Sequence, residues 1–463
     1  MSIFDVVIMA AGKGTRMKSS MPKVLHPLAG KPLVQHVIDT AHSLQARHTI
    51  VITGHGADQV EAALLQANPN AAIQFARQMP QLGTGHAVQQ TVPLLADDGV
   101  VVVLSGDVPL TQASTVQALV DACGGTQLAL LTLDMPDPTG YGRIVRDANA
   151  QVQAIVEHKD ANPAQRAIQE IYSGIMAVPA QLLKPWLARL DNHNAQNEYY
   201  LTDVVKFAVA DGVRVVAHKI SDAAQVAGVN SPVQLAELER THQLRQAHAL
   251  MEQGVRLLDP ARLDVRGELV CDSDVQIDVN CVFEGHVQLG QGVKIGAHCV
   301  IANCRIQAGA VIHPFTHIDG EKLGVTVGEG ALIGPFARLR PGAQLGEQVH
   351  IGNFVEVKNS SMAKGAKANH LAYLGDATVG ERVNYGAGSI TANYDGANKH
   401  RTVIEADVHI GSNCVLVAPV TIGAGGTVGG GSTITKNTEA DALSVARGKQ
   451  ISIANYKRPE KKK

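Results

Sequence analysis

The first residues whose types and spacing could do chemistry lie in the loop that follows the apolar run 6–9. The loop reads Ala10-Ala11-Gly12-Lys13-Gly14-Thr15-Arg16-Met17, and Pro22-Lys23 follow it. Its glycines would let the backbone approach a phosphate, while Lys13, Arg16 and Lys23 would place three cations around a pyrophosphate. The loop matches neither the dinucleotide fingerprint G-x-G-x-x-G nor the P-loop G-x-x-x-x-G-K-[ST]. Taken alone, it predicts either a phosphate-binding loop or an ordinary turn between a strand and a helix.

A second candidate group is Ser105-Gly106-Asp107, which comes directly after the strongly apolar run 100–104. A carboxylate at the end of such a strand could hold Mg²⁺ against a triphosphate, and a turn or helix-cap aspartate is the alternative. The segment 81–86, Gln-Leu-Gly-Thr-Gly-His, supplies glycines and a hydroxyl for close approach to a base or a sugar. Together with the cationic loop, these groups favour a site for a nucleoside triphosphate.

The best candidate for a general base is His370, in the segment 368–376, Ala-Asn-His-Leu-Ala-Tyr-Leu-Gly-Asp. An imidazole with a pKa of about 6.5 can take a proton from an attacking amine at neutral pH. The chain has 19 histidines, so a surface or hydrogen-bonded structural role is the alternative. We expect the stretch 357–379 to interrupt a regular repeat, with a second interruption at 384–396, because solenoid proteins tend to carry function at such breaks.

The front half of the chain must position the first two groups. Residues 1–227 alternate apolar, β-branched runs with helix-like stretches such as 33–44. The runs 6–9, 49–52, 100–104 and 128–131 are continuously apolar, which is typical of buried parallel strands. A β-α-β-α order predicts a doubly wound α/β sheet, which binds ligands at the carboxyl ends of its strands.

The back half of the chain has a six-residue period of aliphatic residues. They are Val327, Ile333, Leu339, Leu345, Ile351 and Val357, and later Ile410, Leu416, Ile422, Val428 and Ile434. Such a period predicts a parallel β-helix, in which each hexad forms one short face and stacked coils bury a column of similar side chains. An upstream copy, from Leu289 to Ile318 with a one-residue slip, extends the solenoid back to about residue 265.

These patterns predict four parts: an α/β domain at 1–230, a linker helix at 231–254, a β-helix at 255–440 and a tail at 441–463. In the linker, Ser231 would be the N-cap, Pro232 the first helical residue and Gly254 the residue after the C-cap. A helix of this length would span about 30 Å. It could hold the two domains apart or pack back on the α/β domain.

Composition and charge exclude several classes of protein. The formal net charge of −2 and a pI of about 6.8 provide no basic field for nucleic acid, although a basic tail, 457–463, is expected to be solvated. Six cysteines without CxxC pairs predict neither a zinc site nor a disulfide framework. No apolar run is long enough for membrane insertion, and no leader precedes the first strand. We expect a soluble, reduced, cytoplasmic protein.

Taken together, the motifs resemble one family. They are Met9 to Met17 with Pro22-Lys23-Val24-Leu25, Gln81 to His86, Gly140-Tyr141-Gly142-Arg143-Ile144, Val156-Glu157-His158-Lys159, Gly228-Val229-Asn230 and the hexads. The first run looks like the signature of sugar-phosphate nucleotidyltransferases. The whole set resembles the bacterial bifunctional family that combines N-acetylglucosamine-1-phosphate uridyltransferase with glucosamine-1-phosphate N-acetyltransferase. This resemblance covers nearly the full chain and implies an N-terminal nucleotidyltransferase domain followed by a left-handed parallel β-helix.

For uridylyl transfer, the resemblance implies that Asp107 and Asn230 ligate Mg²⁺, while Lys23 and Arg16 neutralise the triphosphate of UTP. The residues that it places around the nucleotide and the amino sugar are Ala10, Ala11, Gly12, Gln78, Gly83, Thr84, Ser105, Gly142, Glu157 and Tyr172. Ser105 stands where the family usually has Tyr, and Tyr172 where it usually has Asn. N-acetylglucosamine 1-phosphate would attack the α-phosphorus of UTP in line, giving UDP-N-acetylglucosamine and pyrophosphate. Catalysis would then be positioning and charge neutralisation, without a covalent nucleophile.

For acetyl transfer, the resemblance implies that His370 deprotonates the amine of glucosamine 1-phosphate, which attacks the thioester of acetyl-CoA. Arg340, Lys358, Tyr373 and Asn384 would hold the phosphosugar. The residues that would line the acetyl-CoA site are Ala387, Asn393, Tyr394, Ser412, Gly430 and Arg447, with Gly430 in place of the family's usual Ala. Members of the family pack as trimers that share this site between neighbours, so the resemblance also implies a homotrimer.

Two other functions are compatible with parts of the sequence. The chain could carry only sugar-phosphate nucleotidyl transfer, with the solenoid as an oligomerising and ligand-sensing module. It could also be a structural trimer scaffold with a decayed front domain. The cluster of His370, Tyr373, Asn384, Asn393 and Tyr394 argues against the first, because a scaffold would not need it. The intact Lys23, Asp107 and Asn230 argue against the second.

Overall fold

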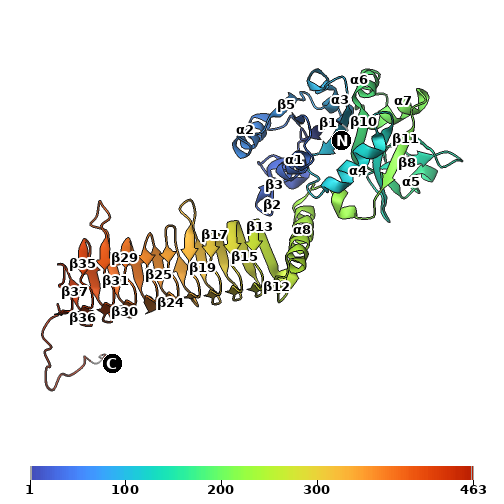
Figure 1. The fold of residues 1–463 in the computed structure, drawn as a ribbon. Coiled ribbons are helices and arrows are strands. Elements are labelled where there is room, and N and C mark those ends of the chain that lie inside the picture. Colours follow the sequence, from blue (N-terminus) through green and yellow to red (C-terminus); the bar gives the residue numbers. More distant parts are fainter. Residues whose placement is uncertain (1–2, 460, 462–463) are drawn as a thin grey trace. The chain divides into compact units, whose positions relative to one another are not determined.

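The computed structural model describes residues 3–459 and 461, and it consists of two compact units, Met1–His242 and Gln243–Lys463. The boundary between them lies within one helix, α8, Pro232–Glu252 (Figure 1). The first unit is a mixed sheet covered by helices, and the second is built almost entirely from short parallel strands.

The first unit contains a nine-stranded sheet in the order β11-β7-β10-β6-β1-β4-β5, with β8 and β9 as an antiparallel pair beside β10. Its strands are β1 Phe4–Met9, β4 Thr49–Thr53, β5 Ile73–Arg77, β6 Val100–Ser105, β7 Leu128–Asp134, β8 Gly142–Arg146, β9 Val152–Val156, β10 Glu170–Pro179 and β11 Val215–Lys219. The four strands expected from apolar runs are β1, β4, β6 and β7. Strand β10 pairs antiparallel with both β6 and β7, and no sequence pattern predicted this direction.

Helices cover both faces of this sheet, because neighbouring residues of each strand point to opposite sides. On one face, Val6, Ile8 and Val102 pack with α1 Leu33–Ser43, α2 Ala57–Ala67 and α4 Ala113–Cys123. On the other face, Val7 and Val101 pack with α3 Thr84–Gln89, α6 Ala180–Ala188 and α7 Val204–Ala210. The unit also contains short 3₁₀ turns, the short helix α5, Pro163–Arg166, and the two-residue strands β2 Pro27–Leu28 and β3 Lys31–Pro32. The predicted doubly wound α/β domain is confirmed.

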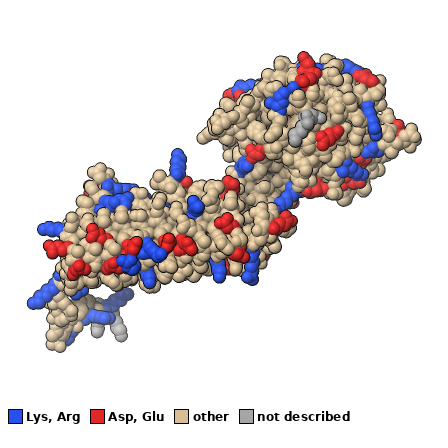
Figure 2. All heavy atoms as spheres, in the orientation of Figure 1, with Lys and Arg blue, Asp and Glu red and all other residues tan. Residues whose placement is uncertain are grey.

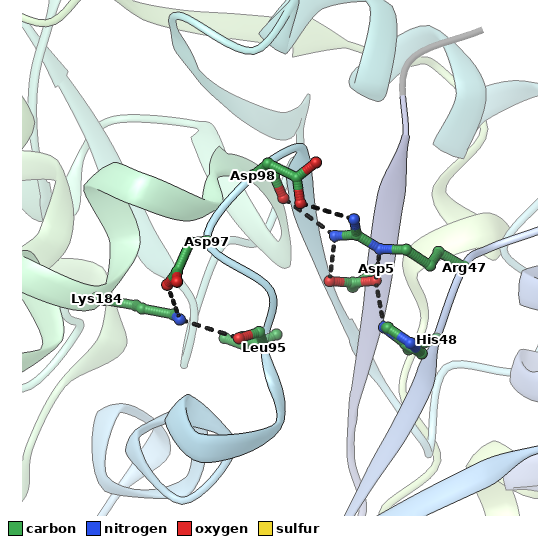
Figure 3. Close-up of polar contacts among 7 residues, drawn as sticks. All are labelled: Asp5, Arg47, His48, Leu95, Asp97, Asp98 and Lys184. Carbon is green, nitrogen blue, oxygen red and sulfur yellow. Dashed lines mark hydrogen bonds and ion pairs between the residues drawn. The ribbon is translucent and has the colours of Figure 1, made fainter.

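A buried carboxylate fastens the start of β1 to the rest of the unit. Asp5 is fully buried, and its two oxygens accept hydrogen bonds from Nε and Nη2 of Arg47 at 2.9 Å, while His48 Nδ1 lies 3.0 Å from Oδ1 (Figure 3). Arg47 also binds Asp98, and Asp5 raises the pKa of the Arg47 guanidinium. This ion pair lies at the opposite end of β1 from the cationic loop, about 17 Å away at 3.4 Å per residue, so we assign it a structural role.

The second unit is a parallel β-helix in which each coil adds strands to two long stacks, and the second stack divides into two branches at β17, which pairs with both β19 and β20. The first stack holds β12 Arg256–Leu257, β14 Gln276–Ile277, β16 Lys294–Ile295, β18 Val311–Ile312, β21 Leu332–Ile333, β24 His350–Asn353, β27 Lys367–His370, β30 Asn384–Tyr385, β33 His409–Ile410, β36 Thr427–Val428 and β38 Leu443–Ser444. The second holds β13 Leu263–Cys271, β15 Cys281–Leu289, β17 Val300–Ile306, β19 His317–Asp319, β20 Val325–Val327, β22 Arg338–Leu339, β23 Gln344–Leu345, β25 Glu356–Lys358, β26 Ser361–Met362, β28 Tyr373–Gly375, β29 Ala377–Val379, β31 Ile390–Ala392, β32 Thr402–Ile404, β34 Val415–Val417, β35 Val420–Ile422 and β37 Thr433–Ile434.

The register of the stacks explains the six-residue period. Ile312 pairs with Ile333, Ile333 with Ile351, and Ile410 with Val428, so each aliphatic residue rests on the one a full coil earlier. All of these side chains are at least 97% buried. The hexapeptide β-helix predicted from the period is confirmed. On the face that Figure 2 draws, basic and acidic side chains are interspersed along the solenoid, and ion pairs such as Lys364–Glu347 and Arg382–Asp407 link successive coils.

One expectation about the solenoid was wrong. The stretch 357–379 does not interrupt the coils, because β25, β26, β27, β28 and β29 all pair in register with the coils before and after. The aliphatic period is lost there for two reasons. Ala368 occupies the interior column, as Tyr385 does in the next coil, and Asn353 and His370, paired across one coil, are 17 residues apart, one fewer than three hexads. The longer excursion is the loop between β31 and β32, where Tyr394 and Lys399 form an isolated antiparallel bridge.

Helix α8 belongs to both units. Its first half packs Leu238 against Leu28, Leu33 and Val229, and Glu239 accepts a hydrogen bond from the backbone N–H of Ala29. Its second half places Ala247 and Leu250 in the solenoid core. No helix of the described residues is both long enough and apolar enough to cross a membrane. After β38 the described residues form no helix or strand. Of the basic tail, residues 460, 462 and 463 lie outside the described residues, as do Met1 and Ser2 ahead of the first strand.

Candidate functional site

The cationic loop follows β1 at the carboxyl edge of the sheet. Ala10 and Ala11 are buried, whereas Gly12, Lys13 and Arg16 are exposed or nearly so. Gly14 has a φ of 60°, and a Cβ on it would lie 2.6 Å from Cβ of Lys23, so no larger residue fits there. The loop therefore presses against the stem of Lys23, which stands in the 3₁₀ turn Lys23–Leu25.

Lys23, Asp107 and Asn230 come together although they are far apart in sequence. Lys23 Nζ donates to Oδ2 of Asp107 at 2.5 Å and to Oδ1 of Asn230 at 3.2 Å. The backbone N–H of Val229 donates to the Asp107 carbonyl at 2.9 Å, which ties the segment before α8 to the end of β6. Two side-chain oxygens thus converge on one cation. That geometry fits a divalent cation as well, because Mg²⁺ is held through one or two protein oxygens together with substrate phosphates.

No group of three or more His, Cys, Asp or Glu side chains that could hold a metal occurs among the described residues. A site built only from protein ligands is therefore not formed in this part of the chain. Asp107 and Asn230 fit a metal that completes its coordination from a bound phosphate, which is the usual arrangement in nucleotide-binding enzymes.

The residues of the segment 78–84 that are predicted to contact the nucleotide are held by several contacts. Gln78 is buried and donates to the carbonyl of Gly83 at 2.9 Å. Gly83 has a φ of 109°, and a Cβ on it would lie 2.6 Å from the carbonyl oxygen of Tyr199. The Thr84 hydroxyl accepts from the backbone N–H of Leu201 at 3.1 Å. These contacts hold the segment 78–84 rigidly against residues 199–201.

The residues predicted to contact the sugar divide into two groups. A Cβ on Gly142 would lie 3.7 Å from both carboxylate oxygens of Glu157, and Oε1 of Glu157 accepts from the Thr202 hydroxyl at 3.1 Å. Burial raises the pKa of Glu157. This carboxylate lines a cavity of about 280 Å³ with Asp160, Asn194 and Tyr200. Gly142 and Glu157 are therefore adjacent, as a shared sugar contact requires.

Tyr172 and Ser105 are placed differently. The Tyr172 hydroxyl is fully buried, has no hydrogen-bond partner among the described residues, and has its pKa raised well above the usual value by that burial. It is not among the side chains lining the cavity beside Glu157. Ser105 Oγ lies 3.6 Å from the position of a Cβ on Gly174. A ligand could reach the Tyr172 hydroxyl only after local rearrangement.

In the solenoid, His370 ends β27 with its side chain exposed. Its Nδ1 lies 3.0 Å from Oδ1 of Asn353, which occupies the matching position one coil earlier. With an amide oxygen as partner, Nδ1 carries the proton and the lone pair is on Nε2. The ring is thus held with its basic nitrogen pointing away from Asn353. Sequence reasoning missed Asn353, because its position opposite His370 depends on the shortened coil.

The four residues predicted to hold the phosphosugar lie on the coil that carries His370 or on coils before and after it. Arg340 follows β22 and donates to Glu356 at 2.8 Å; Lys358, Tyr373 and Asn384 belong to β25, β28 and β30. A Cβ on Gly375 would collide with the Tyr373 hydroxyl, so the tyrosine ring lies over that glycine.

Lys399 is a further cation that the sequence did not single out. It comes close enough to Lys358 to lower the Lys358 pKa, with Arg340 lowering it further. An anion bound between the two lysines would offset this repulsion. Lys399 lies in the loop between β31 and β32, so only the folded loop brings it to Lys358.

A buried carboxylate positions that loop. Asp376 accepts from Asn359 at 2.6 Å through one oxygen and from Asn393 at 2.5 Å through the other, and its own backbone N–H donates to the carbonyl of Lys358. The amide nitrogen of Asn393, which is predicted to contact acetyl-CoA, therefore already donates a hydrogen bond to Asp376. Tyr394, the next residue, remains 61% exposed.

The last predicted residues lie on successive coils. Arg447 Nη1 donates to the Gly430 carbonyl at 2.7 Å, and the Gly431 N–H donates to the Ser412 carbonyl at 2.8 Å. A Cβ on Gly430 would lie 3.4 Å from Ser412 O, an ordinary contact, so alanine would fit equally well here. The carbonyl of Ala387 accepts from Asn413 N–H one coil below. These contacts link the residues across successive coils.

If the site takes the substrates that the family resemblance implies, Lys399→Ala should raise the KM for the sugar phosphate about 10-fold, because it removes a charge-assisted contact of roughly 1.5 kcal/mol. The KM for the acyl donor should change little. Steady-state acetyl transfer measures both values. Lys436→Ala, which removes a lysine from a different part of the solenoid, is the matched control. An unchanged phosphosugar KM in Lys399→Ala would show that the lysine pair does not bind the phosphate.

Comparison with known proteins agrees with both halves of this description. A family model described as a MobA-like NTP transferase domain matches residues 6–171. A model described as bacterial transferase hexapeptide (six repeats) matches residues 324–359 and 401–436.

Relatives similar over the full length carry one printed name. This chain is 73% identical over 470 residues to "Bifunctional protein GlmU" of Paracidovorax citrulli, covering 100% of this chain and 99% of that protein. It is 76% identical over 471 residues to the protein of the same name from a Polaromonas species, covering 99% and 98%. The corresponding protein of Cupriavidus pinatubonensis is 57% identical over 458 residues, covering 99% of each chain. The chain therefore belongs to the family of bifunctional GlmU proteins, enzymes with a uridylyltransferase and an acetyltransferase activity.

Proposed function

We propose that the second unit acetylates glucosamine 1-phosphate with acetyl-CoA and that the first unit joins the product, N-acetylglucosamine 1-phosphate, to UMP from UTP. The observation that carries this proposal is the pair of separate centres, Lys23–Asp107–Asn230 in one unit and His370–Asn353 with the lysine pair in the other. The back half makes what the front half consumes, and the first reaction releases CoA while the second releases pyrophosphate.

In the first unit, a phosphate oxygen of N-acetylglucosamine 1-phosphate attacks the α-phosphorus of UTP as the bond to pyrophosphate breaks. Asp107 and Asn230 hold Mg²⁺, which supplies charge neutralisation at the phosphates when bound. Lys23 and Arg16 add fixed positive charge, while Ala10, Ala11 and Gly12 offer backbone groups to the nucleotide. Gly142 and Glu157 hold the amino sugar. The rigid segment 78–84 favours close, pre-formed contact with the nucleotide.

In the second unit, Nε2 of His370 takes a proton from the amine of glucosamine 1-phosphate as the amine nitrogen attacks the thioester carbon. Collapse of the tetrahedral adduct breaks the C–S bond and releases CoA. Lys358, Lys399 and Arg340 hold the phosphate of the sugar, and Tyr373 and Asn384 complete its site. Acetyl-CoA lies along Ala387, Tyr394, Ser412, Gly430 and Arg447. Asn393 positions this site through Asp376.

We also propose that three copies of the chain assemble through the solenoid, in the cytoplasm. An exposed column of stacked rings supports an intermolecular contact: His298, Phe315, Phe336 and Phe354 lie at one corner of successive coils, with centroids 4.9, 5.1 and 5.4 Å apart. The three phenylalanines are 47–57% exposed, and each has a positive φ. Leu371 continues the column directly beside His370 and is 61% exposed. Contiguous exposed apolar groups of this kind mark protein interfaces.

Phe336→Glu should therefore dissociate the trimer, because it places a charge in the middle of the apolar column. Analytical ultracentrifugation should show smaller species, and acetyl transfer should fall with the trimer fraction while uridylyl transfer is retained. Leu65→Glu, an equally large change at an exposed position of α2, is the control. If Phe336→Glu remained trimeric with full acetyl transfer, the column would not be the interface. If both activities were lost together, the interface would not be specific to the acetyl-transfer site.

A further inference from the structure

We propose that the ammonium of Lys23 and the divalent cation compete for the same two oxygens, so that the binding of UTP assembles the metal site by drawing Lys23 away from it. This inference rests on the proposed Mg²⁺ site at Asp107 and Asn230. It adds to that proposal a cause for the order in which nucleotide and metal are held.

The geometry of the three side chains carries the inference. Lys23 Nζ lies 2.5 Å from Oδ2 of Asp107 and 3.2 Å from Oδ1 of Asn230, which are the two oxygens assigned to the metal. The side chains of Lys23 and Asp107 are only 13% and 19% exposed. The ammonium therefore stands at the point where the two oxygens converge, in a setting that water only partly screens.

A metal and this ammonium cannot share that point. Mg²⁺ requires its oxygen ligands at about 2.0–2.1 Å in near-octahedral geometry. An ammonium that stayed within hydrogen-bond distance of the same oxygens would repel the ion strongly, because like charges at about 4 Å interact unfavourably even in a partly polar environment. Metal binding must therefore displace Lys23 from Asp107.

The cationic loop offers the displaced ammonium a nearby destination. The Lys23 stem packs on Gly14, where an added Cβ would lie 2.6, 3.2 and 3.3 Å from Cβ, Cγ and Cδ of the lysine. The stem is thus fixed against the cationic loop, while the outer part of the side chain is free to turn toward phosphates bound there. A triphosphate offers Lys23 a new anionic partner and at the same time leaves Asp107 without a counter-charge, which favours the metal.

Two consequences follow. Metal alone should bind weakly, because it must break the Lys23–Asp107 ion pair without compensation. UTP and metal should each strengthen the binding of the other by the same factor, since coupling between two ligands is reciprocal, and factors of roughly 5- to 150-fold are typical.

The first test measures the binding of Mn²⁺ to the full chain without nucleotide. The EPR signal of free Mn²⁺ reports how much of the ion remains unbound. Lys23→Met should bind Mn²⁺ roughly 10-fold more tightly than the wild type, within the range typical of coupled sites. Lys13→Met is the matched control: it removes the same charge from the exposed part of the loop and should change the affinity far less. Asp107→Asn should abolish the binding in every background.

The outcomes separate the inference from the proposal beneath it. If Asp107→Asn abolishes Mn²⁺ binding but Lys23→Met binds no more tightly than Lys13→Met, the metal site stands and the competition does not. If Asp107→Asn leaves Mn²⁺ binding unchanged, the metal site itself is misplaced and the inference falls with it.

A second test uses the unaltered protein and so does not depend on whether Lys23→Met folds. Lys23 is acylated with a succinimidyl ester, and its modification is compared with that of the exposed Lys436 by peptide mass spectrometry. Mn²⁺ without nucleotide should raise the labelling of Lys23 several-fold relative to the exposed Lys436 of the other unit, because the metal frees the ammonium. Mn²⁺ with UTP should protect it again. Labelling of Lys23 that is the same with and without Mn²⁺ would overturn the proposal.

Discussion

Replacing His370 by alanine is expected to lower acetyl transfer by about 10²- to 10⁴-fold, the range that a positioned general base contributes. The amine must lose a proton as its nitrogen bonds to the acetyl carbon, and Nε2 of His370 is oriented for that role by Asn353 at 3.0 Å. The side chain is exposed at the end of β27, so its removal should leave the fold intact. Thiol release from acetyl-CoA in the presence of glucosamine 1-phosphate measures the loss.

The same preparation should make UDP-N-acetylglucosamine from N-acetylglucosamine 1-phosphate and UTP at the wild-type rate. Asn353→Ala provides a graded comparison, because it frees the ring to rotate without removing it, and should lower kcat less than His370→Ala while leaving both KM values nearly unchanged. Acetyl transfer that persists at the wild-type rate in His370→Ala would assign the base elsewhere.

Asp107→Asn is expected to have the second largest effect, lowering uridylyl transfer by on the order of 10²-fold or more, as the loss of one preorganised charge at a reacting phosphate does. The substitution keeps the shape of the side chain but removes the charge that Lys23 now balances and that a metal would need. Initial rates of pyrophosphate release at saturating UTP give the comparison. Acetyl transfer in the second unit should not change.

Asp121→Asn serves as the matched control, since that aspartate is exposed on α4 and is bonded only through Gln117 among the contacts described for it. A chelator should act in the same way as Asp107→Asn, stopping uridylyl transfer of the wild type and sparing acetyl transfer. Full uridylyl transfer in Asp107→Asn, or chelator-sensitive acetyl transfer, would contradict the assignment of the metal to the first unit.

The sequence predicted well what depends on local periodicity. Continuous apolar runs identified β1, β4, β6 and β7 because a central strand is buried on both faces. The hexads identified the solenoid because each coil repeats the same environment. The convergence of Lys23, Asp107 and Asn230 was expected only through the family resemblance and the rule that ligands bind at the carboxyl ends of parallel strands. The structure brings the three together.

What the sequence could not predict depends on how distant segments are registered. The direction of β10 is set by pairing with both β6 and β7, and nothing within Glu170–Pro179 encodes it. His370 was expected in an interrupting loop, because a one-residue shortening and Ala368 hide the coil from a six-residue period. Asn353 and Lys399 were missed for the same reason. Their neighbours His370 and Lys358 are reached only across coils or through a folded loop.

The central claim is that one chain carries two independent sites. Mixing two variants, each with only one working site, tests this claim most directly. His370→Ala and Asp107→Asn, purified separately, are each supplied with glucosamine 1-phosphate, acetyl-CoA, UTP and Mg²⁺, and then combined. We expect neither alone to make UDP-N-acetylglucosamine at an appreciable rate, because each lacks one step. The mixture should make it, because the acetylated sugar phosphate diffuses from one protein to the other. A silent mixture of variants that each retain their remaining activity, or substantial product from either variant alone, would contradict the claim.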